Sequence, residues 1–399
     1  MNFLQAAENI KSTIIENRRF LHRHPEIGFD TNTTREYVKS QLESYGLYPQ
    51  ELGKSGLVCC IGKAHNYSDN VILLRADMDA LPMQEDSGLE FASQNAGRAH
   101  CCGHDNHTAM LLGAAQLLKE HEDELPGTVK LMFQSAEEIG QGAQDMIDSG
   151  LLRDPEPQAV LALHVNAKSP LGYINYGKGY TFASTDNFTI VIHGVSCHAA
   201  RPFEGVNPIE IFSHLYQQFE SLKTTQASPS ETIMLSVATV HAGDAHNVVP
   251  STLEAKGTLR TYNASVRTKL KQRMQKVCSK LAELYDIEID LKFSDSLPPL
   301  LCSDEFTDEI LGYIRELVGA DRVSPVPEMK MGSDDFAFVT EHYPDSSAYI
   351  FVGAGPDVDT PYEYGQHNPK VIFNEDMLPI GTAILAHSAM SWLKHRASE

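Results

Sequence analysis

The sequence predicts an α/β fold, a mostly parallel-sheet domain with helices on both faces, interrupted by an inserted α+β ferredoxin-like domain. Short apolar runs alternate with helical stretches in the first half. A β-α-β-β-α-β order fills about 110 residues in the middle, and helix/strand alternation then resumes. Since 399 residues exceed one typical core, we expect two domains.

Three strands of the first half become polar where they end: "VILLRADMDALP", "TVKLMFQSAEE" and "AVLALHV". Between and before them we expect an amphipathic helix near the N-terminus, over 1–26, and another over about 31–45 that ends at Gly46. In parallel sheets ligands collect at the carboxyl ends of the strands. Those ends carry Asp77, Asp79, Glu137, Glu138 and His164.

The middle segment contains strand patterns at 187–194, within "ETIMLSVATVHAG" and "STLEAKGTLRTY", and at "IEIDLKFS", with helices over 206–224 and 265–286. This is the split ferredoxin-like order. We therefore predict a catalytic domain of residues 1–184 and 296–399 and an inserted domain of residues 185–295. A long helix over about 375–395 ends the chain's pattern.

Composition excludes several classes of protein. No apolar run approaches the roughly 18–20 residues of a membrane helix. The first residues lack the apolar core of a signal peptide, so we expect a cytoplasmic protein without membrane partners. The net charge of −21 makes nucleic acid an unsuitable partner. Seven cysteines in a long chain do not suggest a disulfide framework, and buried thiols or metal thiolates fit better.

The segment "HCCGHDNHTAM" gathers metal-binding side chains. Cys102 and His104 are separated by one glycine, so both can reach one ion, and thiolate with imidazole suits zinc. The alternative is a polar helix start in which Asp105 is the N-cap. The Cys-x-His spacing alone does not separate the two.

The segment "QSAEEIGQG" strengthens the metal hypothesis. At a turn, Glu137 and Glu138 point in different directions, so one can bind metal while the other acts as a general base towards water. The alternative is a capping box in which Glu138 closes a helix start after Ser135. Taken singly, His164 would be a satisfied strand-end residue and His367 a surface histidine. The larger set forms a site with room for two ions: Cys102, His104, Glu138, His164 and His367.

Ordered motifs along nearly the whole chain resemble metallopeptidase family 20, in its aminoacylase-like amidohydrolase branch. That branch includes hippurate hydrolases, auxin-conjugate hydrolases and N-acetyl-diaminopimelate deacetylases. The motifs are "LHRHPEIGFDTNTT", "LLRADMDALPM", "CCGHDNHTAMLLGAA", "FQSAEEIGQGAQDMI", "ALHV", "GTLRTYN", "MGSDDFAFV" and "GQHNPKVIFNEDML".

The resemblance implies that the five residues above are metal ligands and that Glu137 is the general base. Asp77 and Asp79 stand where other branches carry His-x-Asp, and Asp79 is expected to orient a ligand. The inserted domain corresponds to a lid and dimerisation domain. His198 in "SCHAARP" would approach the scissile carbonyl, and Asn247 in "HNVVP" would contact substrate.

Three features of the sequence leave the roles of particular residues open. Arg260 in "GTLR" either holds a substrate carboxylate or is solvated. Ser196-Cys197 replaces the two glycines usual before the lid histidine, which makes the role of His198 less secure. Cys101 adds a thiol beside a ligand and is expected to be a buried neighbour.

The resemblance implies hydrolysis of an N-acyl L-amino acid, such as an N-acetyl amino acid, to a carboxylate and a free amino acid. Two divalent ions per chain are expected, zinc or manganese, with cobalt or nickel as alternatives, in a homodimer or higher homo-oligomer assembled through the lid domain. The alternatives are a metal-dependent dipeptidase or carboxypeptidase, a non-enzymatic ligand-binding homologue and a thiol-redox protein. The Glu137–Glu138 pair disfavours the binding protein, and adjacent cysteines lack the C-x-x-C spacing of redox motifs.

Overall fold

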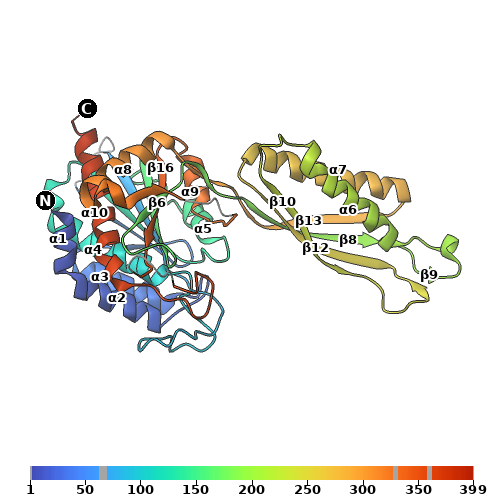
Figure 1. Ribbon diagram of the computed structural model, residues 1–399, viewed down its shortest axis with the longest axis horizontal. Helices are drawn as coiled ribbons and strands as arrows, with labels where there is room; N and C mark the ends of the chain where they lie inside the picture. Colours follow the sequence, from blue (N-terminus) through green and yellow to red (C-terminus); the bar gives the residue numbers. More distant parts are fainter. Residues whose placement is uncertain (1, 63–69, 327–330, 357–361, 399) are drawn as a thin grey trace. The chain divides into compact units, whose positions relative to one another are not determined.

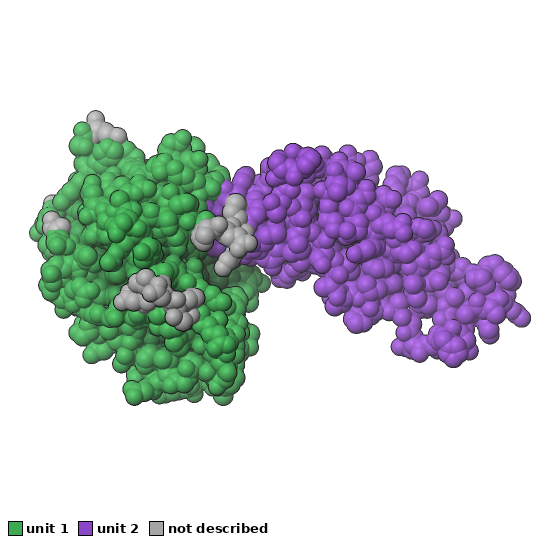
Figure 2. All heavy atoms as spheres, in the orientation of Figure 1, with its two compact units in different colours: residues 1–179, 301–328, 334–399 green, residues 180–300, 329–333 purple. Residues whose placement is uncertain are grey.

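The computed structural model describes residues 2–62, 70–326, 331–356 and 362–398 (Figure 1). The chain divides into two compact units, coloured separately in Figure 2. Unit 1 comprises residues 1–179, 301–328 and 334–399, and unit 2 comprises residues 180–300 and 329–333. Each unit has its own hydrophobic core.

Unit 1 is built on an eight-stranded sheet in the order β1-β2-β4-β3-β5-β16-β6-β15. The four central strands run parallel, which confirms the predicted mostly parallel α/β sheet. They are β4 (Thr128–Gln134), β3 (Val71–Asp77), β5 (Ala159–Asn166) and β16 (Ser347–Gly353). The outer strands are β1 (Gln50–Leu52), β2 (Gly56–Gly62), β6 (Ile174–Tyr176) and β15 (Val323–Pro325).

The two faces of this sheet differ in chemistry because successive strand residues point to opposite sides. On β3, Ile72 and Leu74 belong to the main core cluster, together with apolar residues of α4 (His104–Glu120) and α10 (Leu378–Arg396). Arg75 and Asp77 therefore lie on the other face. That face is covered by α5 (Gly142–Asp148) and by the chain that leads into α9 (Ala337–His342), through polar contacts described below. The predicted helices on both faces are thus confirmed.

The N-terminal residues form two helices where one was expected. The helix α1 (Phe3–Asn9) packs mainly on α10, and α2 (Lys11–Arg23) packs mainly on α4. Between them, Ile10 has φ −104° and ψ 12°, outside the helical region. Because the apolar positions serve two different partner helices, the single predicted helix is wrong.

The other helices of unit 1 lie close to their expected places. The helix α3 (Asn32–Ser44) is followed by Tyr45 and then Gly46, whose φ of 79° is the left-handed value that favours glycine. The remaining elements are α8 (Asp304–Val318) and the short 3₁₀ helices η1 (Glu122–Glu124), η3 (Ala320–Arg322) and η4 (Glu375–Met377).

Unit 2 contains an antiparallel sheet in the order β10-β12-β8-β13. The chain order is β8 (Thr185–His193), α6 (Pro208–Thr225), β10 (Ile233–His241), β12 (Thr252–Thr261), α7 (Ala264–Tyr285) and β13 (Glu288–Leu297). Both the sequence order and the strand order are those of the ferredoxin-like arrangement.

Short elements complete the described chain: β7 (Gly179–Phe182), β9 (Cys197–His198), η2 (Pro202–Glu204), β11 (Val248–Val249) and β14 (Leu300–Cys302). Within the described ranges, no helix combines the length and apolar character needed to cross a bilayer.

Candidate metal centre and active site

The carboxyl edge of the parallel sheet in unit 1 carries a cluster of polar side chains. The strand β3 ends at Asp77, β4 leads into Glu137 and Glu138, and β5 contributes His164. Parallel strands end at the same edge, so these residues of distant sequence position meet there.

The turn before α4 brings Cys102 and His104 to this edge. Gly103 has φ 108°, and a Cβ at this position would lie 2.4 Å from Val165 Cγ2, so only glycine fits. The helix begins at His104 with Gly103 as its N-cap residue, which makes the predicted Asp105 cap wrong. Instead, the buried Asp105 carboxylate accepts hydrogen bonds from Arg18 Nε and His22 Nδ1, each at 2.8 Å.

The His104 imidazole has one nitrogen engaged and one free of hydrogen bonds. Its Nδ1 lies 2.8 Å from the backbone carbonyl oxygen of Asp79, to which it donates. Its Nε2 is buried and has no hydrogen-bond partner in the described structure. A buried nitrogen without a partner is costly, whereas a metal ion there would satisfy it.

The two glutamates are fixed by their backbone. The Glu137 and Glu138 N–H groups donate to the two Asp79 carboxylate oxygens at 3.0 and 3.2 Å, and the preceding Ala136 has a left-handed φ of 61°. The predicted capping box is wrong, because α5 begins only at Gly142. The Ser135 hydroxyl lies 2.6 Å from that of Thr31.

Two histidines from distant segments complete the cluster. His164 donates its Nδ1 proton to the Val165 carbonyl oxygen at 2.7 Å and places Nε2 3.5 Å from Cys102 Sγ. His367 has a left-handed φ of 62°, and its Nε2 lies 3.6 Å from Glu138 Oε1.

The five predicted ligands form two overlapping groups that share Cys102. One group is Cys102, His104 and His164, and the other is Cys102, Glu138 and His367, with the ligand atoms of each group within 4.8 Å of one another. The donors are a thiol, imidazoles and a carboxylate, which suits zinc and other borderline divalent metals. His104 Nε2 and Glu138 Oε1, which are buried without hydrogen-bond partners, also fit a cation.

The cluster carries more acidic groups than positive charges to balance them, which also favours a bound cation. Burial, with the neighbouring Asp79 and Asp77 carboxylates, raises the pKa of Glu138 to about 7 against the opposing effect of His104. Burial and the Asp334 carboxylate raise the pKa of Glu137 well above its usual value. Carboxyl groups that resist ionisation mark a place short of positive charge. A bound cation would supply it.

A buried polar network behind the cluster was not foreseen in the sequence. Arg75, 1% exposed, donates to Asp77, Asp334 and Asp335. Asp335 also accepts from Gln134 Nε2 at 2.6 Å and from the backbone of α5, which covers this face of the sheet. An arginine inside an apolar strand, in "VILLRAD", was the available signal, since a buried charge requires partners.

The predicted substrate-contact residues lie in unit 2. His198 is exposed on β9, which pairs with β11, and the Ala199 N–H donates to the Asn247 carbonyl oxygen at 3.0 Å. His198 and Asn247 therefore lie close to each other on neighbouring segments of unit 2. Arg260 on β12 donates to the Met331 carbonyl oxygen at 2.6 Å. The guanidinium therefore already has an internal acceptor.

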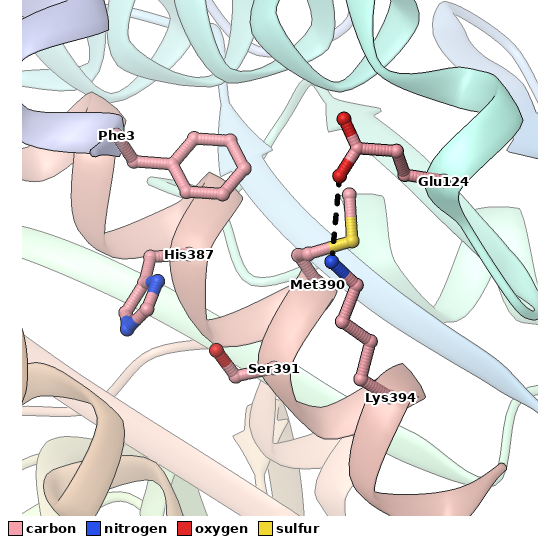
Figure 3. A pocket seen from close by; sticks show the side chains of 6 residues that line it. All are labelled: Phe3, Glu124, His387, Met390, Ser391 and Lys394. Atoms are coloured by element: carbon pink, nitrogen blue, oxygen red, sulfur yellow. Dashed lines mark hydrogen bonds and ion pairs between the residues drawn. The ribbon is translucent and has the colours of Figure 1, made fainter. Parts of the chain in front are cut away.

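A small pocket lies elsewhere in unit 1, on the surface of α1, η1 and α10. Figure 3 shows the lining side chains and the ion pair between Lys394 and Glu124, whose atoms are 3.5 Å apart. None of the predicted site residues lines it: its residues are Phe3, Glu124, His387, Met390, Ser391 and Lys394.

A thiol, imidazoles and carboxylates gathered at the carboxyl edge of a parallel sheet, beside a second glutamate, define the class of metallohydrolases. The chain belongs to one family of that class. It matches the model of peptidase family M20/M25/M40 over residues 73–391 and is a hydrolase that acts on amide bonds.

Curated relatives extend over nearly the whole chain. "Thermostable carboxypeptidase 2" of Saccharolobus solfataricus is 32% identical and aligns with 96% of each chain. "N-acetyl-L-cysteine deacetylase" of Bacillus subtilis is 34% identical, with 95% of this chain and 88% of the relative covered. "IAA-amino acid hydrolase ILR1-like 2" of Arabidopsis thaliana is 33% identical, with 97% and 86% covered.

Solved structures share the fold. A putative aminohydrolase from methicillin-resistant Staphylococcus aureus superposes with a TM-score of 0.91 at 29% identity, over 98% of this chain and 100% of that one. A Bacillus subtilis protein described as a dinuclear metal-binding peptidase of the M20 family superposes with a TM-score of 0.79 at 28% identity, over 97% and 99%.

Proposed function

We propose that this protein is a metal-dependent amidohydrolase that cleaves the amide bond of N-acyl L-amino acids. The observation that carries the proposal is the Glu137–Glu138 turn. Asp79 fixes the backbone of both glutamates. Glu138 lies in one ligand group with Cys102 and His367, and both glutamates lie close to His104, so one carboxylate can bind metal while the other acts as a base. A protein that only binds metal needs the Glu138 carboxylate and has no use for a second carboxylate that acts as a base.

The ligand set supports two divalent ions held by Cys102, His104, Glu138, His164 and His367. We propose zinc or manganese, with cobalt or nickel as alternatives. A bound divalent ion supplies Lewis acidity, which polarises a carbonyl group and makes water a stronger acid.

The chain's own residues supply the proton transfers. The Glu137 carboxylate takes a proton from the attacking water molecule while the water oxygen bonds to the acyl carbon of the substrate. As the carbon–nitrogen bond breaks, Glu137 gives that proton to the leaving nitrogen. The products are a carboxylic acid and the free amino acid. In unit 2, we propose that His198 donates to the oxyanion, a contribution worth a factor of about 10²–10³, and that Asn247 and Arg260 contact the substrate.

A panel of N-acetyl, N-benzoyl and longer N-acyl L-amino acids, assayed together with measured metal content, tests the proposal. Release of the free amino acid by the metal-loaded protein, abolished by a chelator and restored by one of the four metals, is the expected result. A metal-loaded protein that cleaves none of the panel contradicts it.

A second candidate is a carboxypeptidase or dipeptidase acting on substrates with a free amine. The names of two relatives from Saccharolobus solfataricus, carboxypeptidases at 32% identity, favour it. The names of the deacetylase and of the hydrolases of IAA-amino acids favour N-acyl substrates. Rates on N-acetyl-alanine and on glycyl-alanine discriminate, since the amide bonds match and only the free amine differs.

We also propose a homodimer or higher homo-oligomer assembled through unit 2. The strand β10 is an edge of its sheet, so its outer backbone groups are available for pairing. Val240 on that strand and Tyr216 on α6 are 46% and 42% exposed, which offers apolar surface beside that edge for a second copy to cover. Light scattering of the wild type and of Val240→Lys tests this, with dissociation to monomers expected in the variant.

A further inference from the structure

The backbone of one residue, Val165 near the end of β5, forms hydrogen bonds through both its N–H and its carbonyl oxygen to side chains at the cluster. Its N–H donates to His107 Nε2 at 2.9 Å. Its carbonyl oxygen accepts from His164 Nδ1 at 2.7 Å and from Gln366 Nε2 at 2.6 Å.

These bonds fix the tautomer of His107. A backbone N–H can only donate, so His107 Nε2 is the acceptor and carries no proton. The proton is on Nδ1, which donates to Asp77 Oδ1 at 2.6 Å. Asp77 is itself bound by Arg75. Although His107 lies within 4.8 Å of Asp77 and His104 in a geometry that could hold an ion, neither of its nitrogens is free for a metal.

The Val165 carbonyl oxygen binds one proposed ligand, His164, directly, and binds Gln366, the neighbour of another proposed ligand, His367. His164 has its Nδ1 committed to the Val165 carbonyl, which leaves Nε2 facing Cys102. Gln366 directly precedes His367, and the His367 N–H donates to the Cys101 carbonyl oxygen at 2.9 Å. The loop that carries His367 is therefore attached at one point to β5 and at the next residue to the Cys102 turn.

We propose that His107 and Gln366 are positioning residues that hold His164 and His367 in ligand geometry through the Val165 backbone. The proposal rests on the proposed function in one respect, that these two histidines bind metal. Groups that orient metal ligands typically change metal affinity 10- to 100-fold, roughly, when they are removed.

The first test is cobalt affinity of the whole chain, measured by competition with a coloured chelator. Gln366→Leu keeps the side-chain volume and removes the donor. Gln366 is partly exposed, so the fold should tolerate the change. We expect the Kd for cobalt to rise about 10- to 100-fold. The melting temperature of the metal-free protein should be unchanged. Gln5→Leu, which removes an exposed amide hydrogen bond on α1, is the matched control and should bind as the wild type does.

The second variant, His107→Asn, separates the two bonds of His107. Its amide nitrogen can replace Nδ1 towards Asp77, but nothing reaches the Val165 N–H. We expect weaker cobalt binding and an altered visible absorption of the bound cobalt, because His164 loses its fixed orientation. If this variant does not fold, the Gln366→Leu result alone decides.

The outcomes are distinguishable. Wild-type cobalt affinity in Gln366→Leu overturns the positioning role while leaving the proposed function intact. A wild-type chain that binds no cobalt overturns the metal site and, with it, the inference. Weakened cobalt binding in Gln366→Leu, with wild-type binding in Gln5→Leu, supports both the metal site and the positioning role of Gln366.

Discussion

The carbonyl oxygen of Asp79 accepts a hydrogen bond from His104 Nδ1 at 2.8 Å. The carboxylate of the same aspartate accepts the backbone N–H of Glu137. One residue thus orients a proposed ligand through its main chain and the proposed base through its side chain. Asp79 therefore couples the positions of His104 and Glu137, because any shift of Asp79 moves both residues.

Glu137→Gln should slow hydrolysis strongly without removing metal. The amide keeps the shape of the side chain but cannot accept a proton from water, so kcat should fall by about 10²–10⁴. Steady-state kinetics on the best N-acyl substrate, together with elemental analysis, measure both quantities. Glu156→Gln, at an exposed position, is the control. Turnover within a few-fold of the wild type in Glu137→Gln would rule out the base.

The adjacent cysteines should behave differently on substitution. Cys102 belongs to both ligand groups, so Cys102→Ala should lose metal and activity together. Cys101 is 2% exposed and belongs to the hydrophobic core cluster, so Cys101→Ala should keep metal and lose about 1 kcal/mol of stability through the small cavity. Metal content and urea unfolding check the pair. Equal metal loss in both variants would contradict this assignment.

Removing metal should destabilise the wild type. Without a cation, His104 Nε2 and Glu138 Oε1 stay buried without hydrogen-bond partners. A metal ion present at one hundred times its Kd stabilises the folded state by about 2.7 kcal/mol. Differential scanning calorimetry with and without chelator should show a higher melting temperature for the loaded protein. The same shift in Cys102→Ala would mean that the ion binds elsewhere.

A buried ion network next to α4 should make stability depend on pH. Burial lowers the pKa of His22, but its bonds to the Asp105 and Glu85 carboxylates outweigh burial, and the net pKa is raised. The charged histidine therefore stabilises the fold fully below pH of about 6.5, its unfolded value, and this stabilisation is lost as pH rises through the raised folded value.

The test compares His22→Gln with the wild type by urea unfolding of the metal-free protein at pH 6 and pH 9. Loss of one partner of a buried ion pair costs about 3–5 kcal/mol, and this deficit should be present at pH 6 and smaller at pH 9. A deficit of the same size at both pH values would show that His22 is neutral when folded.

Periodicity and strand-end chemistry predicted much of the structure. The apolar runs that end in Asp77, Gln134 and His164 are strands of one parallel sheet, and this shared edge brings their polar neighbours together. His367 lies in a loop and not at a strand end, so nothing near it in the sequence indicates which residues it meets; in the folded chain its Nε2 lies 3.6 Å from Glu138 Oε1.

Other features depend on tertiary packing that sequence patterns do not encode. Asp105 has the local signature of a helix cap, yet Arg18 and His22, more than eighty positions away, bind its carboxylate. The capping-box pattern around Ser135 failed for a similar reason, because Asp79 takes the backbone N–H of Glu138. Local rules name what a side chain can do, and distant partners decide which option is used.

The sequence separation between Cys102 and His367 has a consequence for biosynthesis. The chain emerges from the ribosome with the Cys102 turn early and the His367 loop after the whole of unit 2. Until that last segment has been made, the proposed second ligand group lacks its His367 donor, and a nascent chain would not hold both proposed ions. Full loading of the proposed site would therefore follow synthesis of both separated parts of unit 1.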